Sequence, residues 1–315
     1  AGGTDVMVQI NKGAVSVDQV VAIGRVPELQ GWRREGDWLH LGAAVTYSEM
    51  MGEELSSLVP ALAQASRTVG SPQIRNAGTI GGNLGTSSPA GDTLPVLFAL
   101  DAVLTIRSST ELREVPISQF VVGVKSNTLQ PGELIEKISV PVLEGPQEFC
   151  KIGPRNAMVI SVASFTLLAD QKENRVRSCL GTVGPVPIRS MEAEDLLSNS
   201  VNWGENTVSS EVLDAFSSLC ADAAKPIDDH RGSAVATYYH GLVIYHVWKD
   251  ALCIAGICQP AVRPLRWYLP TVDPGSVSFR VRQHRFRCVV RCGSLERYRA
   301  RGPSEYVEGT GYTVT

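Results

Sequence analysis

The sequence predicts an α+β fold in two parts, and three observations support this prediction. Up to residue 140, short segments with the period-two alternation of strands are interleaved with short segments of helical character. After Gly145-Pro146, two strand-like segments are followed by two helix-like ones. Strands followed by helices indicate an α+β arrangement rather than a βαβ series. We therefore place a domain boundary near residue 146, with domains at 1–146 and 147–253.

Local signals define the elements of the first part. Thr46 is a typical N-cap for the short helix that follows it, and Pro60 suits the first turn of the next helix. That second helix should run to Val69, because Gly70 is a common C-terminal stop. The strands expected in this part are residues 38–43, 102–107 and 134–140, the last of them closed by Pro141.

The second part is predicted to hold a pair of strands and a pair of helices. Residues 160–169 and 176–183 are the expected strands, and a polar turn at 172–174 joins them. Residues 191–197 and 211–224 are the expected helices.

The composition is that of a globular protein. Hydrophobic residues make up 43% of the 315 residues, which excludes a disordered chain. The net charge is only -3, which argues against nucleic acid as a partner, and no apolar run is long enough to span a bilayer. The seven cysteines are scattered and lack the spacing of zinc or iron–sulfur ligands. We expect free thiols in a reducing cytoplasm and no metal on this chain.

Residues 254–315 differ in composition from the rest of the chain. They hold ten Arg, no Lys and four acidic residues, whereas residues 1–253 hold 19 basic and 28 acidic residues. Neither helical nor strand periodicity persists in this Arg-rich tail. We expect a frame-shifted or disordered segment, and the alternative is a genuine basic tail that docks a partner subunit.

The strongest chemical signal is the segment A-G-T-I-G-G-N-L at residues 77–84. Glycine lets backbone N–H groups approach a ligand closely, and successive N–H groups form an anion site that suits a diphosphate. Thr79, Asn83 and Asp92 add a hydroxyl, an amide and a carboxylate that can form hydrogen bonds. The spacing is neither that of a Rossmann fingerprint nor that of a P-loop. On composition alone, a ligand-free glycine-rich turn is the alternative.

A second glycine segment opens the chain, with the sequence A-G-G-T-D at residues 1–5 followed by the apolar run V-M-V. It again combines a glycine pair with a hydroxyl and a carboxylate. Two such segments favour one shared cofactor that bears a diphosphate.

Longer motifs surround both glycine segments. They are A-G-G-T-D at residues 1–5, G-S-x-Q-I-R-N-x-G-T-I-G-G-N-L-x-x-x-S-P-x-x-D at 70–92, K-x-G-x-R-x-A at 151–157 and D-x-R-G-S-A at 229–234. In this order they resemble the FAD-binding subunit of the molybdenum hydroxylases, the family of xanthine dehydrogenases and carbon monoxide dehydrogenases. The resemblance covers residues 1–235. The family carries a further segment before A-G-G-T-D, so we expect this chain to be N-terminally truncated.

The resemblance implies the fold, the cofactors and the partners. The fold would be a two-subdomain FAD-binding domain of the p-cresol methylhydroxylase type, followed by a small α+β domain with a three-stranded antiparallel sheet and helices. FAD would bind this chain, and the 2Fe–2S clusters and the molybdopterin would lie on a small and a large partner subunit. The chain would then pass electrons from the clusters to NAD or another acceptor, with no catalytic residues of its own. The alternatives are a stand-alone flavin-dependent oxidoreductase of the same fold and a scaffold that has lost FAD.

The resemblance also implies roles for single residues. Lys151 would place a cation near the flavin ring, and the alternative is a solvated surface lysine. Val69 and Ile135 match positions in the cofactor pocket, although a plain core role fits both equally well. Arg75 either reaches a phosphate or caps its own loop, and His40 is expected to be a partly buried structural residue. The candidate FAD-binding residues are Ala1, Gly2, Gly3, Thr4, Asp5, Val6, Val69, Thr79, Ile80, Gly81, Gly82, Asn83, Asp92, Ile135 and Lys151.

Overall fold

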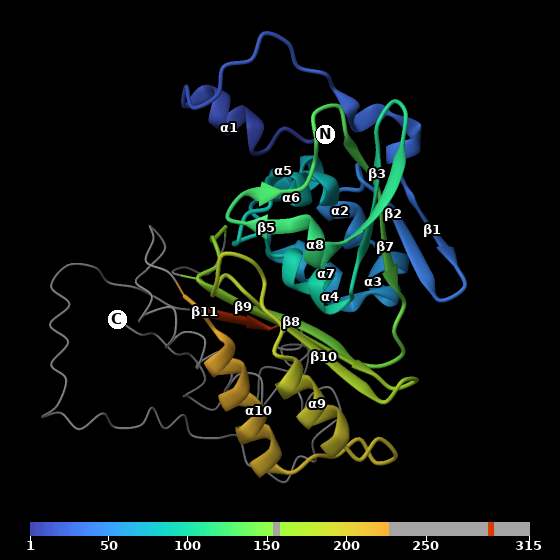
Figure 1. The fold of residues 1–315 in the computed structure, drawn as a ribbon, viewed down its shortest axis with the longest axis vertical. Helices are drawn as coiled ribbons and strands as arrows, with labels where there is room; N and C mark the ends of the chain where they lie inside the picture. The colour runs from blue at the N-terminus through green and yellow to red at the C-terminus, as the bar shows by residue number, and fades with distance from the viewer. Residues whose placement is uncertain (154–157, 227–288, 293–315) are drawn as a thin grey trace, which may run out of the picture.

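The computed structural model describes residues 1–153, 158–226 and 289–292. Two antiparallel sheets lie one above the other, with helices between them and below the second sheet (Figure 1). Helix α1 (Val6–Asn11) stands apart at the N-terminal end and has no buried residue. Two short 3₁₀ helices, η1 (Ile23–Arg25) and η2 (Pro27–Leu29), then connect it to the first sheet.

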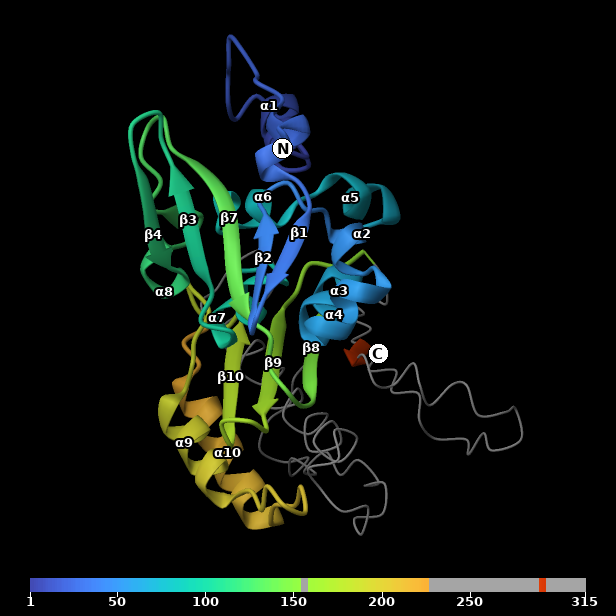
Figure 2. The ribbon, with the colours of Figure 1, turned by 90° about the vertical axis from the view of Figure 1, so that its right-hand side faces the viewer.

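The first sheet has five strands in the order β1-β2-β7-β3-β4, all antiparallel to their neighbours (Figure 2). Leu39, Leu41, Leu104, Ile138 and Val140 are fully buried and lie at alternating positions of β2, β3 and β7, so one face of the sheet forms the core. The strands are β1 (Trp32–Glu35), β2 (Trp38–Gly42), β3 (Val103–Arg107), β4 (Leu112–Pro116) and β7 (Leu134–Pro141).

Short helices fill the long connection between β2 and β3. Thr46 caps the first of them in a capping box with Glu49, and Pro60 stands at the first turn of α4, as the sequence predicts. These helices are α2 (Tyr47–Met50), α3 (Glu53–Leu58), α4 (Pro60–Thr68), α5 (Pro72–Ala77), α6 (Ile80–Thr86) and α7 (Leu94–Ala99). Between β4 and β7 come α8 (Ile117–Phe120) and the hairpin of β5 (Val121–Gly123) and β6 (Ser126–Asn127).

The second sheet has the strand order β10-β9-β8-β11. Helices α4 and α7 contact its strands β8, β9 and β10, so they lie between the two sheets. The main hydrophobic core is therefore shared by both sheets, because Phe149, Leu168 and Cys179 belong to it. The strands are β8 (Gln147–Gly153), β9 (Ala163–Asp170), β10 (Arg175–Gly181) and β11 (Val289–Cys292).

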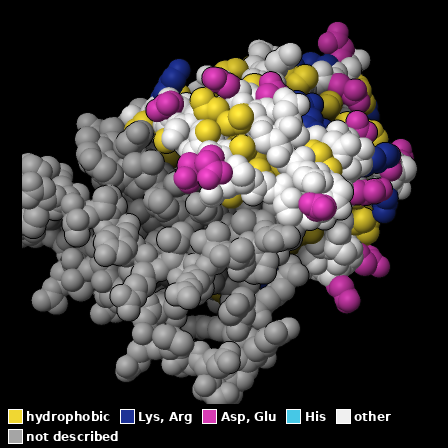
Figure 3. Space-filling model, turned by 90° about the horizontal axis from the view of Figure 1, so that it is seen from below, with side chains coloured by type: hydrophobic (Ala, Val, Ile, Leu, Met, Phe, Trp, Pro, Cys, Tyr) yellow, Lys and Arg dark blue, Asp and Glu magenta, His cyan; other side chains and the backbone are white. Residues whose placement is uncertain are grey.

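Helices α9 (Met191–Ser200) and α10 (Ser210–Ala223) pack beneath the second sheet around a separate cluster that includes Leu197, Leu213 and Phe216. Both helices carry acidic residues and neither carries Lys or Arg. Seen from below, acidic and hydrophobic side chains are accordingly spread over the described surface, and the Lys and Arg side chains lie mostly toward its rim (Figure 3).

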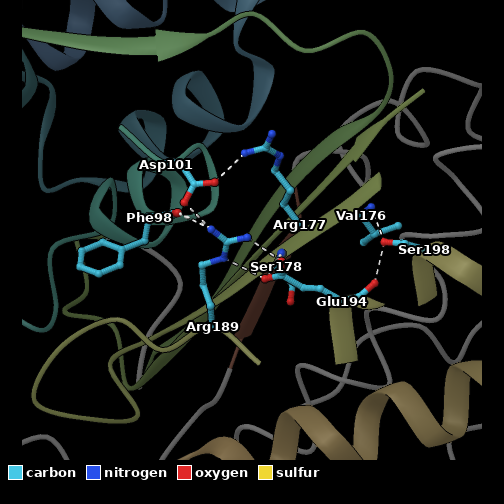
Figure 4. A network of polar contacts seen from close by, with 8 residues as sticks. All are labelled: Phe98, Asp101, Val176, Arg177, Ser178, Arg189, Glu194 and Ser198. Atoms are coloured by element: carbon cyan, nitrogen blue, oxygen red, sulfur yellow. Dashed lines mark hydrogen bonds and ion pairs between the residues drawn. The ribbon is translucent and has the colours of Figure 1, made fainter. Parts of the chain in front are cut away.

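A network of ion pairs joins the two halves of the chain (Figure 4). Asp101, in the turn after α7, accepts from Arg189 Nη1 at 2.5 Å and from Arg177 Nη1 at 2.7 Å. Arg189 also forms a bidentate pair with the buried Glu194 of α9. Glu194 in turn accepts from the backbone N–H of Ser178 at 3.0 Å. The turn after α7, strand β10 and helix α9 are thus tied together by charge-assisted hydrogen bonds.

The structure confirms the α+β class and the strands and helices expected in both parts, with ends that shift by a few residues. Two points differ from expectation. The glycine-rich residues 80–86 form helix α6 rather than a loop. The second sheet also gains a fourth strand, β11, from the Arg-rich tail, and the rest of that tail lies outside the described residues.

The described residues hold no group of three His, Cys, Asp or Glu side chains that could bind a metal ion, and no helix in them is long and apolar enough to cross a membrane. Cys150, Cys179 and Cys220 are buried and form no disulfide bond among the described residues. Burial raises the pKa of Cys220 to about 12 and that of Cys179 well above its ordinary value, so both thiols are protonated and unreactive. His40 is partly buried on β2, and its Nδ1 lies 2.8 Å from Ser139 Oγ.

Candidate cofactor-binding site

The two glycine segments lie against each other. A Cβ atom on Gly2 would lie 1.7 Å from the carbonyl oxygen of Ala77, so the first segment packs directly on the residue that precedes Gly78. At the other end of α6, Thr86 Oγ1 donates to Asp5 Oδ2 at 3.0 Å. The first segment therefore runs along α6. The two motifs are far apart in the sequence but adjacent in the fold.

In the second segment, the backbone N–H groups already have partners. Ile80 N and Gly81 N donate to the carbonyl oxygens of Val45 and Ala43, both at 2.9 Å. Gly82 N donates to the N-cap hydroxyl of Thr79 at 3.0 Å. The expectation that these three N–H groups form an anion site therefore does not match their hydrogen bonds.

Packing explains the glycine at residue 81. A Cβ atom there would lie 2.6 Å from the carbonyl oxygen of Ala43 and 2.7 Å from its Cβ. Ile80 and Thr79 are both buried beside it. The second segment is therefore packed against Ala43 and Val45 on one side and against the first segment at Ala77.

In the first segment, the N–H groups are available. Among the described residues, the backbone N–H groups of residues 2–6 donate to no partner. Gly3 has a φ of +72°, a conformation that favours glycine, and its carbonyl accepts from Met7 N as α1 begins. Ala1, Asp5 and Val6 are exposed, and Gly2, Gly3 and Thr4 are half-buried. Successive free N–H groups in a bent backbone are the kind of arrangement that can bind an anion.

Asn83 connects the glycine segments to Asp92. Its Oδ1 accepts from Thr93 Oγ1 at 2.7 Å, and Gly91 packs so closely on its side chain that a Cβ would lie 2.8 Å from Nδ2. Tyr47 lies under Gly78 and also hydrogen-bonds with Asn83. Burial raises the pKa of Tyr47 far above its ordinary value, and the charge of Asp92 adds to this.

Asp92 and Lys151 form a buried ion pair, although the family resemblance implied a separate role for each. Lys151 Nζ lies 2.5 Å from Asp92 Oδ2, and their side chains are only 4% and 5% exposed. The alternative of a solvated surface lysine is therefore wrong. Asp92 Oδ1 is buried and has no partner among the described residues.

The remaining candidates have structural contacts. Ile135, on β7, is buried in the main core, and Val69 packs against that core from the C-terminal end of α4. Arg75 Nη1 donates to the carbonyl oxygens of Val69 and Gly70 at 3.0 and 2.9 Å. Of the two roles considered for Arg75, these contacts favour capping of its own loop.

Sequence reasoning missed three residues of the site. Tyr47, Thr68 and Val159 contact the candidate residues, but none of them stands in a motif. Thr68 and Val159 supply backbone carbonyls to Lys151, a role that any residue type can fill. Only the tertiary structure reveals them.

The part of the chain that holds both glycine segments matches a known family of domains. Residues 1–143 match the FAD binding domain in molybdopterin dehydrogenase. The chain is 30% identical over 239 residues to the glyceraldehyde dehydrogenase medium chain of Sulfolobus acidocaldarius, covering 74% of this chain and 83% of that protein. It is 33% identical over 207 residues to the nicotinate dehydrogenase FAD-subunit of Eubacterium barkeri, covering 62% of this chain and 70% of that protein.

Solved structures share the fold. Quinoline 2-oxidoreductase from Pseudomonas putida 86 superposes with a TM-score of 0.73 at 23% identity, over 81% of this chain and 89% of that chain. Carbon monoxide dehydrogenase from Hydrogenophaga pseudoflava gives 0.72 at 23% identity, over 80% and 88%. Together with the relatives, the matched domain shows that this chain belongs to the family of FAD-binding subunits of the molybdenum hydroxylase dehydrogenases.

Proposed function

We propose that this chain is the electron-transfer subunit of a molybdenum hydroxylase. It takes electrons from the 2Fe–2S clusters of a small partner subunit and passes them to NAD or another acceptor, while a large molybdopterin subunit hydroxylates the substrate. The observation that carries the proposal is the direct packing of the two glycine segments, with the N–H groups of the first left free.

The residues fit FAD on two counts. The free N–H groups of residues 2–6 suit the diphosphate, because they follow one another along a backbone that has a positive φ at Gly3. The buried and unpartnered Asp92 Oδ1 suits a hydroxyl donor of the cofactor, since an unpaired buried oxygen is otherwise costly. FAD supplies the capacity to take up a pair of electrons and to release them singly.

In this proposal the chain's own residues bind and orient the cofactor. The first glycine segment holds the diphosphate, and Asp92 holds a hydroxyl of the sugar or the ribityl chain. Thr79, Ile80, Gly81, Gly82 and Asn83 support the first segment from below. Val69 and Ile135 contribute apolar surface at the edge of the core.

The relatives support the partner assignment, because their names describe parts of larger enzymes. The Sulfolobus protein is a medium chain, and a protein of Paenarthrobacter nicotinovorans that is 29% identical over 247 residues is a nicotine 6-hydroxylase medium subunit. Reading frames for a molybdopterin subunit and a ferredoxin-like subunit with a C-x4-C-x2-C motif should therefore flank the one for this chain.

The proposal is tested in two stages. The purified chain should show the visible absorption of a flavin and bind one FAD. Co-expressed with the two flanking reading frames, it should be reduced by the substrate of the complex and reoxidised by NAD or an artificial acceptor. A chain that binds FAD but is never reduced in the complex would contradict the electron-transfer role.

A further inference from the structure

The ion pair of Lys151 and Asp92 joins the second sheet to the turn between α6 and α7. Lys151 lies on β8, and Asp92 lies in the turn between α6 and α7. Both side chains are almost fully buried. Removing two charges from water costs more than their attraction restores, unless further hydrogen bonds satisfy both groups. The role of the pair therefore depends on the other hydrogen bonds that Lys151 and Asp92 form.

The Lys151 ammonium has no N–H left for a ligand. It donates to Asp92 Oδ2 at 2.5 Å and to the carbonyl oxygens of Thr68 and Val159, both at 3.1 Å. An ammonium group has three N–H donors and no acceptor, so these contacts use all of them. A direct hydrogen bond from Lys151 to the flavin ring would require one of them to break.

In contrast, only one oxygen of the Asp92 carboxylate has hydrogen-bond partners among the described residues. Its Oδ2 lies within hydrogen-bond distance of Lys151 Nζ and of Thr68 Oγ1, the latter at 3.0 Å. Its Oδ1 is buried and has no partner in the described part of the chain. Because Lys151 and Thr68 hold one oxygen in place, the direction of the other oxygen is fixed as well.

We propose that Lys151 is a positioning residue, which orients Asp92 so that Oδ1 accepts a hydrogen bond from a hydroxyl of FAD. Through its bond to the carbonyl oxygen of Val159, Lys151 also ties that residue to the same carboxylate. The proposal rests on the proposed function, since it assumes that FAD binds here. It differs from the role implied by family resemblance, in which the lysine cation acts on the ring itself.

The chain contains a matched control for this pair. Lys172, in the β9–β10 turn, pairs with Asp37, in the β1–β2 turn, at 2.7 Å. This second Lys–Asp pair also joins the two halves of the chain, but its side chains are 52% and 67% exposed. Removing it tests the general effect of losing an ion pair between the domains.

The experiment measures the FAD affinity of apoprotein by titration for Asp92→Asn, Lys151→Met and the double variant. Each single change should lower the affinity about ten- to a hundredfold, as expected for one charge-assisted hydrogen bond. If Lys151 acts through Asp92, adding Lys151→Met to Asp92→Asn should lower it by less than about threefold more. Effects that multiply in the double variant would overturn the proposal. Asp37→Asn and Lys172→Met should leave the affinity unchanged.

A second measurement separates positioning from a direct action on the ring. At saturating FAD, Lys151→Met should keep the flavin spectrum and midpoint potential of the wild type, and a shifted potential at unchanged affinity would overturn the proposal. If Lys151→Met alone fails to fold, the double variant removes both charges together, and its affinity is compared with that of Asp92→Asn. A further drop there counts against the proposal, and equal affinities support it. Wild-type protein that binds no FAD would refute the proposed function itself.

Discussion

The two glycine segments have similar sequences but opposite structures. The first, residues 1–5, is half-buried at its centre and exposed at both ends, and its backbone N–H groups have no partner among the described residues. The second, residues 77–84, leads into a helix whose first N–H groups all bond within the protein. The same residue type thus stands beside free N–H groups in one segment and permits close packing in the other. A glycine motif by itself does not say which of its members faces the cofactor.

This difference assigns separate tasks to the segments. The second is a support, because Gly78 and Gly81 let the backbone approach Tyr47 and Ala43. In the proposed function the first segment binds the cofactor, because its N–H groups have no partner among the described residues, to which it is attached through contacts that include Gly2 and Asp5. Substitutions in the support should therefore act on stability, and substitutions in the first segment should act on cofactor affinity.

The largest effect is expected from Gly81→Val. The new side chain would collide with the backbone of Ala43, and overpacking of this kind costs about 3 kcal/mol or more. We expect a strong loss of thermal stability and, with it, of bound flavin. Gly85→Ala is the matched control, since a Cβ at Gly85 meets no atom within 4 Å. A Gly81→Val protein that melts like the wild type but lacks flavin would show that Gly81 acts on the cofactor rather than on packing.

Gly2→Ala should instead lower the affinity for FAD and leave the stability nearly unchanged. Its Cβ would overlap the carbonyl oxygen of Ala77, so the first segment must move away from the second. Because residues 1–5 contribute no side chain to the buried core, the melting temperature of the apoprotein should change little. FAD affinity, measured by titration, should fall at least about tenfold, the equivalent of a single lost hydrogen bond. Unchanged affinity would mean that the first segment does not bind the diphosphate.

Thr79→Ala is a smaller change in the second glycine segment. The hydroxyl accepts from Gly82 N and caps α6, so its loss should cost about 1 kcal/mol of stability. Thr79→Ser keeps the cap and should behave like the wild type. Well below the melting temperature, FAD affinity should be nearly equal in all three proteins. A tenfold loss in Thr79→Ala alone would place the hydroxyl in contact with the cofactor.

The sequence predicted most of the fold because its local signals agree with the tertiary structure. The capping box at Thr46, Pro60 at the start of α4 and the alternation in β7 depend on neighbouring residues only. The helix at Ile80–Thr86 was missed because three glycines in seven residues oppose a helix, and packing against Val45 and Ala43 overrides that preference.

The site was predicted less completely than the fold. Family motifs brought Asp92 and Lys151 into the candidate set, but no pattern could show that these two residues contact each other across 59 positions of the sequence. The backbone carbonyls of Thr68 and Val159 complete the surroundings of Lys151, and backbone groups leave no mark in a sequence. Charge alone suggested a surface lysine, and only the packing of β8 against α4 explains its burial.

The smallest effect is expected at acid pH. There, unfolding of the chain can be distinguished from release of the cofactor. Arg113 donates to Glu133 in a bidentate pair, which lowers the pKa of Glu133 from 4.5 to about 2. A lowered carboxyl pKa stabilises the folded protein above the unfolded-state pKa, and this contribution disappears as the pH falls from about 4.5 toward 2. Glu133→Gln should therefore be slightly less stable than the wild type at neutral pH and lose less stability over that acid range. Because neither residue contacts a glycine segment, the pH at which FAD dissociates should be the same in both proteins, as followed by flavin fluorescence beside thermal melting. A shift in FAD release that follows the shift in stability would show that acid frees the cofactor by unfolding the chain, and not by protonating groups at the site.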